Sequence, residues 1–465
     1  MVDTIWEKYL PEDITKAGPG PKPRTAFRKQ LRVLILDLYV AWLDDPELCI
    51  GVSMSPNSYH VNSRYNAIHI SKKIIPIIKE LHAAGLLDMA KGSYTAPGAR
   101  GNRTTRIRAS EELQAMFREA KFIRDDVGRV EGEEIIILRD DKRKQVEYDD
   151  TDQTNAMRED LKAYNELIQS SFIDISTLEE PKIQVHSDVE ASLVTINADS
   201  AQTHRIFSRN RWDMNGRFYG GWWQRINSDW RSRILIDDKP TVEVDFKALH
   251  VAMLYAKNNV QLFCDPYDLE QKLFKGFPRK AVRKIIKQLV LMAINAKEKG
   301  AAYKAFRESF PAGNICKSMK NDELDKFLDA FLELNPKVAD YLFTDQGIRL
   351  MYLDSQITER IHKHFTEQGV PVLSVHDSYI IDVMKVDEMR EVMARVSEEV
   401  VGVELATSIK VPGLPEYSDV TDAQLQEHID NRTGSRSRGY MERLFAYQDR
   451  TGRSIGPEAG LEDLD

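Results

Sequence analysis

The chain has 465 residues, 42% of them hydrophobic, and a formal net charge of -8. This length predicts two or three globular units rather than one. No apolar run approaches the roughly 18 to 20 residues needed to span a bilayer, and the N-terminus lacks the basic-then-apolar order of a signal peptide. We therefore expect a cytoplasmic protein without membrane contact. The three cysteines, Cys49, Cys264 and Cys316, lie too far apart for a disulfide framework or a zinc cluster.

The charge is distributed unevenly. Residues 60–108 carry nine Lys/Arg and two acidic residues, and residues 201–300 carry nineteen Lys/Arg and ten acidic residues. Positive charge concentrated in this way favours contact with phosphate backbones, even in a chain whose total charge is negative.

Residues 1–24 are rich in Pro and Gly and predict a flexible arm. Residues 25–124 hold two helical stretches followed by a basic ribbon, PGARGNRTTRIRA. This order resembles a winged helix-turn-helix domain, in which the helix before the ribbon enters the major groove and the ribbon contacts phosphates. The resemblance implies duplex DNA as a partner; a helical domain that binds protein is the alternative. The implied DNA-binding residues are Lys72, Lys73, Arg100, Arg103, Arg106 and Arg108.

Residues 125–200 are acidic and mix strand-like and helical patterns, so we expect a connector or a thumb-like element. Residues 413–465 are polar, with the segment NRTGSRSRGY, and predict a flexible tail. Between them, residues 201–412 carry the segments with the chemistry of a catalytic site.

Two aspartates in this region follow strand patterns. In TVEVDF the β-branched residues alternate with charged ones, and Asp245 falls at the strand end. In VPVLSVHDSYIIDV two apolar strands flank Asp377 at a tight turn. Each aspartate alone is typical of an ordinary cap or turn. Together they predict a pair of Mg²⁺ ions, with Mn²⁺ as a possible substitute, because a carboxylate in apolar surroundings needs a cation.

A basic helix lies between the two aspartates in the sequence. Its residues Arg283, Lys287, Leu291 and Asn295 recur every four positions and therefore share one face. A solvated face is the plain interpretation of such spacing. With the two aspartates, the two cations predict a triphosphate site, because Arg grips phosphate oxygens bidentately and Lys acts as a point charge.

The three motifs in this order resemble the palm and fingers of the superfamily that joins family A DNA polymerases with single-subunit phage-type RNA polymerases. Asp245 matches the motif A aspartate, Arg283 and Lys287 match the motif B cations, and His376 and Asp377 match the His-Asp pair of motif C. The resemblance covers about residues 205–385. It implies an α+β fold, with an antiparallel palm sheet and helical fingers joined to the N-terminal winged helix.

The resemblance also implies roles for further residues. WDMNGRFYGG resembles the segment that lies against the template strand, with Arg217 on the template backbone. His376 would orient the primer terminus, and Leu291 would lie under the base and sugar. His250 stands where DNA polymerases have Glu and RNA polymerases a small residue, and Asn295 replaces a tyrosine, so both bear on sugar selection. Ser378 follows the RNA polymerase form, and we expect it to contact substrate.

The sequence thus predicts a template-directed nucleotidyltransferase that uses a DNA template, a primer and nucleoside triphosphates. The first hypothesis is a compact DNA polymerase without proofreading, acting in the replication of a plasmid, phage or mobile element. The bulk of His250 favours deoxynucleotides, whereas Asn295 is able to bond a ribose hydroxyl. The alternatives are an RNA polymerase or primase, and a catalytically inactive DNA-binding initiator or regulator. The sequence leaves the oligomeric state open.

Overall fold

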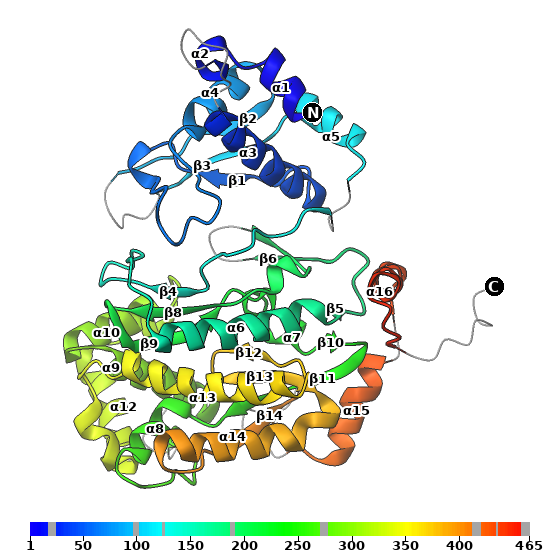
Figure 1. Ribbon diagram of the computed structural model, residues 1–465. Coiled ribbons are helices and arrows are strands. Elements are labelled where there is room, and N and C mark those ends of the chain that lie inside the picture. Colours follow the sequence, from blue (N-terminus) through cyan, green and yellow to red (C-terminus); the bar gives the residue numbers. More distant parts are fainter. Residues whose placement is uncertain are drawn as a thin grey trace. The chain divides into compact units, whose positions relative to one another are not determined.

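The chain forms an α+β structure that divides into two compact units, unit 1 from Met1 to Glu134 and unit 2 from Ile135 to Asp465 (Figure 1). The computed structural model describes residues 1–16, 25–95, 102–122, 126–186, 191–269, 278–411, 420–433 and 436–456. Within these ranges no helix has both the length and the apolar character needed to cross a membrane.

Unit 1 packs helices on a three-stranded antiparallel sheet with the strand order β1-β3-β2. Its main elements are α1 (Val2–Lys8), α2 (Glu12–Thr15), α3 (Thr25–Asp44), β1 (Ile50–Val52), α4 (Ile74–Ala83), β2 (Leu87–Ala90), β3 (Thr105–Ala109) and α5 (Glu111–Glu119). Helix α4 buries an isoleucine-rich stripe, and Pro76 lies in its first turn, where a missing backbone N–H costs little. On β3, Thr105, Ile107 and Ala109 are buried, so the intervening arginines project from the opposite face.

Unit 2 is built around a six-stranded sheet with the order β12-β13-β11-β10-β5, in which β14 also pairs with β11. All of these pairings are antiparallel, as expected for an α+β chain. The strands are β5 (Ile173–Ile175), β10 (Ile234–Ile236), β11 (Lys239–Phe246), β12 (Leu373–Val375), β13 (Ser378–Asp382) and β14 (Thr407–Lys410).

Two apolar cores cover the two faces of this sheet. Val242, Val244 and Phe246 of β11 join a core with helices α8 (Leu249–Ala256), α9 (Arg279–Asn295), α10 (Lys299–Glu308), α12 (Asn321–Leu334), α13 (Gly347–Glu367) and α14 (Val386–Val401). Ile380 of β13 joins the other core, whereas its neighbours Tyr379 and Ile381 join the first. This period of two fixes the register of the central strands.

The segment expected to be an acidic connector packs into unit 2. Helix α6 (Asp152–Ser170) begins at a Thr151–Thr154 capping box and buries apolar residues in the second core. That core also contains a sheet of β4 (Ile136–Leu138), β8 (His204–Ser208) and β9 (Arg211–Tyr219), and the hairpin of β6 (Lys182–His186) and β7 (Ala191–Thr195). Residues 135–170 are thus structural parts of unit 2.

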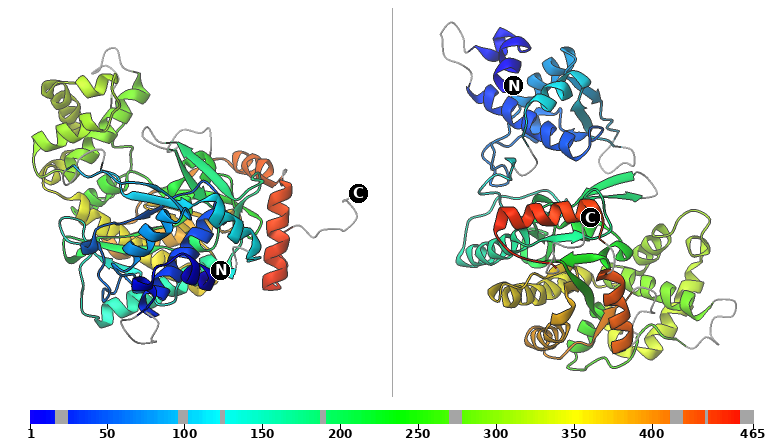
Figure 2. Two further views of the ribbon diagram at one scale, coloured as in Figure 1. Left: turned by 90° about the horizontal axis from the view of Figure 1, so that it is seen from above. Right: turned by 90° about the vertical axis from the view of Figure 1, so that its right-hand side faces the viewer.

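The described part of the expected polar tail is helical, with α15 (Asp422–Thr433) and α16 (Arg438–Thr451). Tyr440 and Leu444 of α16 pack on Phe172 and Leu235. Figure 2 shows α15 and α16 on one side of unit 2, and helices α9, α10 and α12 on the opposite side.

Candidate active site

Strand pairing brings the two predicted metal ligands together. Asp245 lies opposite Ser378 in the β11–β13 ladder, and the Phe246 N–H donates to the Asp377 carbonyl oxygen at 3.4 Å. Val375 pairs with Ser378, so His376 and Asp377 form a two-residue turn between β12 and β13. His376 has a φ of 60°, which is uncommon for a residue other than glycine. The hairpin therefore presents Asp377 next to the end of β11.

The Asp245 carboxylate is nearly enclosed. Its Oδ2 lies 2.8 Å from the Lys410 Nζ, while its Oδ1 is buried and accepts no hydrogen bond from the described residues. Burial and the neighbouring charge of Asp377 raise the pKa of Asp245 to about 7. An acid in this state is suited to bind a cation, because a cation would offset both effects.

A third carboxylate, Asp354 of α13, belongs to the same cluster. Its side chain is fully buried and forms an ion pair with the Arg217 guanidinium. Burial raises the pKa of Asp354 to about 7, and the charge of Asp377 adds to the shift. Arg217 also lies 3.5 Å from the His250 ring. We expected Arg217 on the template backbone, but its side chain is only 11% exposed and lies among these carboxylates.

Two histidines lie beside Arg217 and Asp377. Burial and the charge of Arg217 lower the pKa of His250 to about 4. Burial and Arg217 also lower the pKa of His376, whose ring contacts the Tyr219 ring edge to face at 5.6 Å. Both imidazoles are therefore neutral at neutral pH, and each is able to donate one hydrogen bond and accept another.

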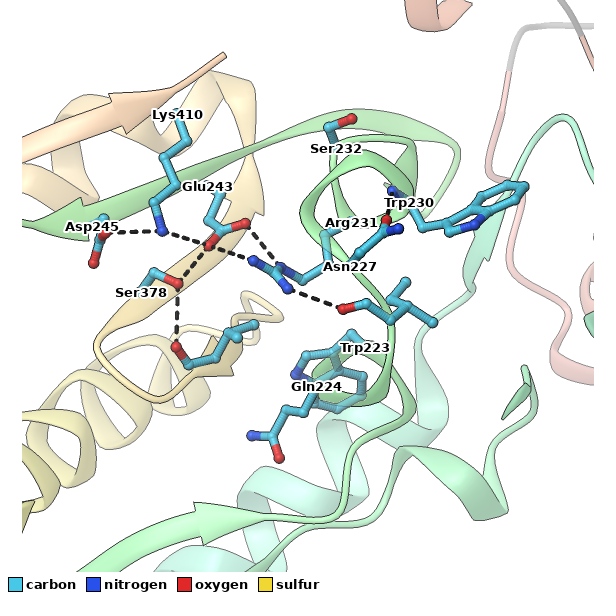
Figure 3. A network of polar contacts seen from close by, with 12 residues as sticks. Trp223, Gln224, Asn227, Trp230, Arg231, Ser232, Glu243, Asp245, Ser378 and Lys410 are labelled. Atoms are coloured by element: carbon cyan, nitrogen blue, oxygen red, sulfur yellow. Dashed lines mark hydrogen bonds and ion pairs between the residues drawn. The ribbon is translucent and has the colours of Figure 1, made fainter. Parts of the chain in front are cut away.

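Ser378 lies inside the sheet rather than on an open surface. It is 2% exposed, and its hydroxyl donates to the Glu243 Oε1 at 2.6 Å. Glu243 also accepts bonds from Arg231 at 3.0 and 3.3 Å and from Lys410 at 3.0 Å (Figure 3). Burial would raise the pKa of Glu243, but Lys410 and Arg231 outweigh it and hold that pKa below its usual range. Ser378 thus anchors the hairpin, and it was expected to contact substrate.

The predicted triphosphate face is the least buried side of α9. Its opposite side buries Val282, Ile285, Ile286, Leu289, Val290, Ala293 and Ile294. The Arg283 Nε donates to the Asp265 carboxylate at 2.6 Å, and Lys287, Leu291 and Asn295 are exposed. Asn295 donates to the Leu291 carbonyl at 2.8 Å. The four residues share one stripe, as their spacing predicts.

The predicted DNA-binding residues lie on two parts of unit 1. Lys72 and Lys73 directly precede α4, and the Lys73 Nζ lies 5.6 Å from the centre of the Phe27 ring. Arg103 and Arg106 are exposed on the ribbon. Arg108 forms ion pairs with Glu47 and with Asp88, and Arg100 lies outside the described residues.

The sequence-based prediction missed Glu243, Asp354 and Lys410. A signal for Glu243 was present, because it stands two positions before Asp245 on a strand and so shares its face. Asp354 occupies a position in the buried stripe of α13, where an acid is unusual. Lys410 carries no local signal, because strand pairing alone brings it to Asp245.

Comparisons with known proteins do not identify the family. No family model matches the chain, and no curated protein matches it. Among solved structures, the chain is similar to the POL domain of Pol1 from M. smegmatis in complex with DNA primer-template and dNTP. That similarity has 9% sequence identity and a TM-score of 0.29, and it covers 83% of this chain and 69% of that chain. A similarity of this strength establishes neither the family nor the function.

Proposed function

We propose that the chain is a template-directed nucleotidyltransferase, and within that class a compact DNA polymerase without proofreading. The observation that carries the proposal is the β11–β13 pairing, which sets Asp245 beside Asp377. One buried oxygen of Asp245 accepts no hydrogen bond within the described residues. The biological role we propose is replication of a plasmid, phage or mobile element, with unit 1 binding duplex DNA.

The donor set fits Mg²⁺, with Mn²⁺ as a substitute. The described residues contain no group of three or more His, Cys, Asp or Glu side chains able to hold a metal. Mg²⁺ in phosphate-transfer sites is commonly bound by one or two carboxylates together with substrate phosphates and water. Asp245 and Asp377 are such a pair. When bound, the two ions would lower the pKa of the primer 3'-hydroxyl and stabilise the pyrophosphate leaving group.

The exposed stripe of α9 supplies the contacts to the triphosphate. Asp265 fixes the Arg283 guanidinium through the 2.6 Å bond to its Nε, and in this proposal the guanidinium contributes positive charge to the triphosphate site. Lys287 follows one turn later and adds a second positive charge. Leu291, 37% exposed, provides an apolar surface for the base and sugar.

The neutral histidines serve positioning and selection in this proposal. His376 sits beside Asp377 in the turn and is able to hold the primer terminus by a hydrogen bond. The His250 ring takes up space beside Arg217 and Asp377, and this bulk favours deoxynucleotides. The exposed amide of Asn295 is able to bond a ribose hydroxyl, and this observation favours the second candidate, an RNA polymerase or primase.

Primer extension on a defined DNA template tests the proposal. We expect Asp377→Asn to reduce nucleotide incorporation by about 10²-fold or more, because one carboxylate of the metal pair is lost. Asp382→Asn is the matched control, since Asp382 ends the same strand and pairs with Lys239. Primer extension by Asp377→Asn at the wild-type rate would contradict the assignment of Asp377 as a metal ligand.

The same assay distinguishes the candidates. Incorporation of dNTPs from a primer supports a DNA polymerase, and incorporation of NTPs without a primer supports an RNA polymerase or primase. A wild-type chain that binds duplex DNA but incorporates neither substrate would be an inactive initiator or regulator.

A further inference from the structure

Lys410 ends β14 directly opposite Glu243 of β11. Its Nζ lies 2.8 Å from the Asp245 Oδ2 and 3.0 Å from the Glu243 Oε1. Figure 3 shows the ammonium group between the two carboxylates; Ser378 donates to the same Glu243 oxygen as Lys410, and the Arg231 Nε donates to the other. A single cation on a strand therefore bridges a proposed metal ligand and a buried glutamate.

The carboxylates around the Lys410 ammonium group need a positive charge to offset their mutual repulsion. Asp245 and Glu243 are 15% and 7% exposed, and the charge of Asp377 acts on Asp245. Ionised carboxylates packed this closely repel one another, and burial strengthens the repulsion because less water screens it. Arg231 reaches Glu243, whereas Asp245 receives its ion pair from Lys410.

The two oxygens of Asp245 differ in a way that bears on metal binding. Oδ2 is taken by Lys410, and Oδ1 accepts no hydrogen bond from the described residues. We propose that Lys410 is a positioning residue. Its ammonium group holds Asp245 in place before a divalent ion arrives and then competes with that ion for the carboxylate. This inference rests on the proposed function, because it takes Asp245 and Asp377 as the metal ligands.

The Lys410→Met variant separates the two effects. Without the ammonium group, less positive charge offsets the carboxylates of Asp245, Glu243 and Asp377 in the metal-free protein, so its melting temperature in EDTA should fall. A divalent ion would meet no competing charge, so Mn²⁺ should bind at least about threefold more tightly than to the wild type. A side chain that only fills space would not produce this opposite pair of changes.

The experiment uses the full chain and Mn²⁺ alone. Binding is measured by electron paramagnetic resonance at one fixed pH above 8, and melting is followed with EDTA and with Mn²⁺. Lys410→Arg should resemble the wild type in both measurements, because it keeps the charge. Lys239→Met is the matched control, since Lys239 pairs with Asp382 across β11 and β13 at 3.4 Å, and it should leave Mn²⁺ affinity unchanged.

Wild-type or weaker Mn²⁺ affinity in Lys410→Met would overturn the inference, as would an unchanged melting temperature in EDTA. If Lys410→Met does not fold, Lys410→Gln supplies the uncharged comparison and must show the tighter binding. Failure of the proposed function gives a different result. A wild-type chain that binds Mn²⁺ and shows the Lys410 effect, but does not extend a primer, would refute the polymerase and leave the role of Lys410 intact.

Discussion

Asp354 is the most confined acid of the cluster. Its side chain is fully buried and paired with Arg217, and its Oδ1 accepts no hydrogen bond from the described residues. Burial raises its pKa from 3.8 to about 7. A folded-state pKa above the unfolded one means that the native state binds the proton more tightly. The resulting stabilisation is complete below pH 4 and is lost as the pH rises to about 7.

We therefore expect Asp354→Asn to change how stability depends on pH. In EDTA, the free energy of unfolding of the wild type minus that of the variant should fall between pH 4 and 7, by on the order of 2–4 kcal/mol. Urea denaturation at several pH values measures this difference. The difference between the two proteins is used because both contain His250. The pKa of His250 is lowered to about 4, so this residue makes stability rise with pH in the same window, and its contribution cancels in the difference.

Asp340→Asn, at an exposed position of the same unit, is the control for this prediction. The amide introduced by Asp354→Asn keeps an oxygen able to accept from the Arg217 Nε but takes up no proton, so the slope of the difference reports the Asp354 proton. A difference that stays constant from pH 4 to 7 would show that Asp354 is ionised throughout that range.

The sequence predicted those site residues that belong to local motifs. Asp245 and Asp377 stand at strand ends within recognisable segments, and the structure places them side by side. Lys410 and Asp354 belong to no such segment. They reach the cluster through a strand pairing and a buried helix face, and both depend on contacts between parts of the chain far apart in sequence. Local patterns carry no information on those contacts.

The end of α9 is joined to the start of α13 by backbone hydrogen bonds. The N–H groups of Phe343 and Gln346 donate to the Ala293 and Ile294 carbonyls of α9 at 2.8 and 2.9 Å, and the Asp345 N–H donates at 2.9 Å to the carbonyl of Ala296, the residue that follows α9. These bonds satisfy carbonyls that a helix end leaves without a partner. They also tie the helix with the proposed triphosphate stripe to the helix that carries Asp354.

Gly347 lies against the Asn295 side chain at this junction, and a substitution of Gly347 tests that contact. A Cβ at this position would lie 1.8 Å from the Asn295 Oδ1, so Gly347→Ala should lower the free energy of unfolding by about 1–3 kcal/mol. Asn295→Ala in the same chain should recover most of the loss, because it removes the clashing amide. A double-mutant cycle by chemical denaturation measures the coupling.

Gly300→Ala is the control for the junction. A Cβ at Gly300, in α10, meets nothing within 4 Å, so this change should leave stability equal or slightly higher. If Gly347→Ala were as harmless as Gly300→Ala, the contact between Asn295 and Gly347 would not constrain the two helices.

The sequence and the structure differ most in the C-terminal elements. The polarity of NRTGSRSRGY predicted a flexible tail, yet Arg436 and Arg443 pair with Asp238 and Asp174 of unit 2. Asp174 is almost fully buried, and burial raises its pKa although Arg443 opposes the shift. The composition of a segment does not distinguish an arginine that pairs with a buried carboxylate from an arginine that points into solvent. The apolar stripe of Tyr440, Leu444 and Tyr447 was the available sign of a packed helix.

At the scale of the whole molecule, the chain keeps its two proposed tasks in separate units. The ribbon arginines lie in unit 1, and the carboxylate cluster lies in unit 2. Arg103 is exposed, whereas Arg108 is held by Glu47 and Asp88. An arginine already paired with two carboxylates gains less from a phosphate, because the new contact replaces an existing one.

We therefore expect Arg103→Ala to weaken binding of duplex DNA more than Arg108→Ala does, and to lower the salt dependence of affinity by about one counterion. Fluorescence anisotropy over a range of salt concentrations measures both quantities. Incorporation at saturating primer-template should remain at the wild-type level in either variant. Asp377→Asn should show the reverse, with wild-type duplex affinity and lost incorporation. If Arg103→Ala abolished incorporation at saturating DNA, the two tasks would not be separable, and unit 1 would take part in catalysis.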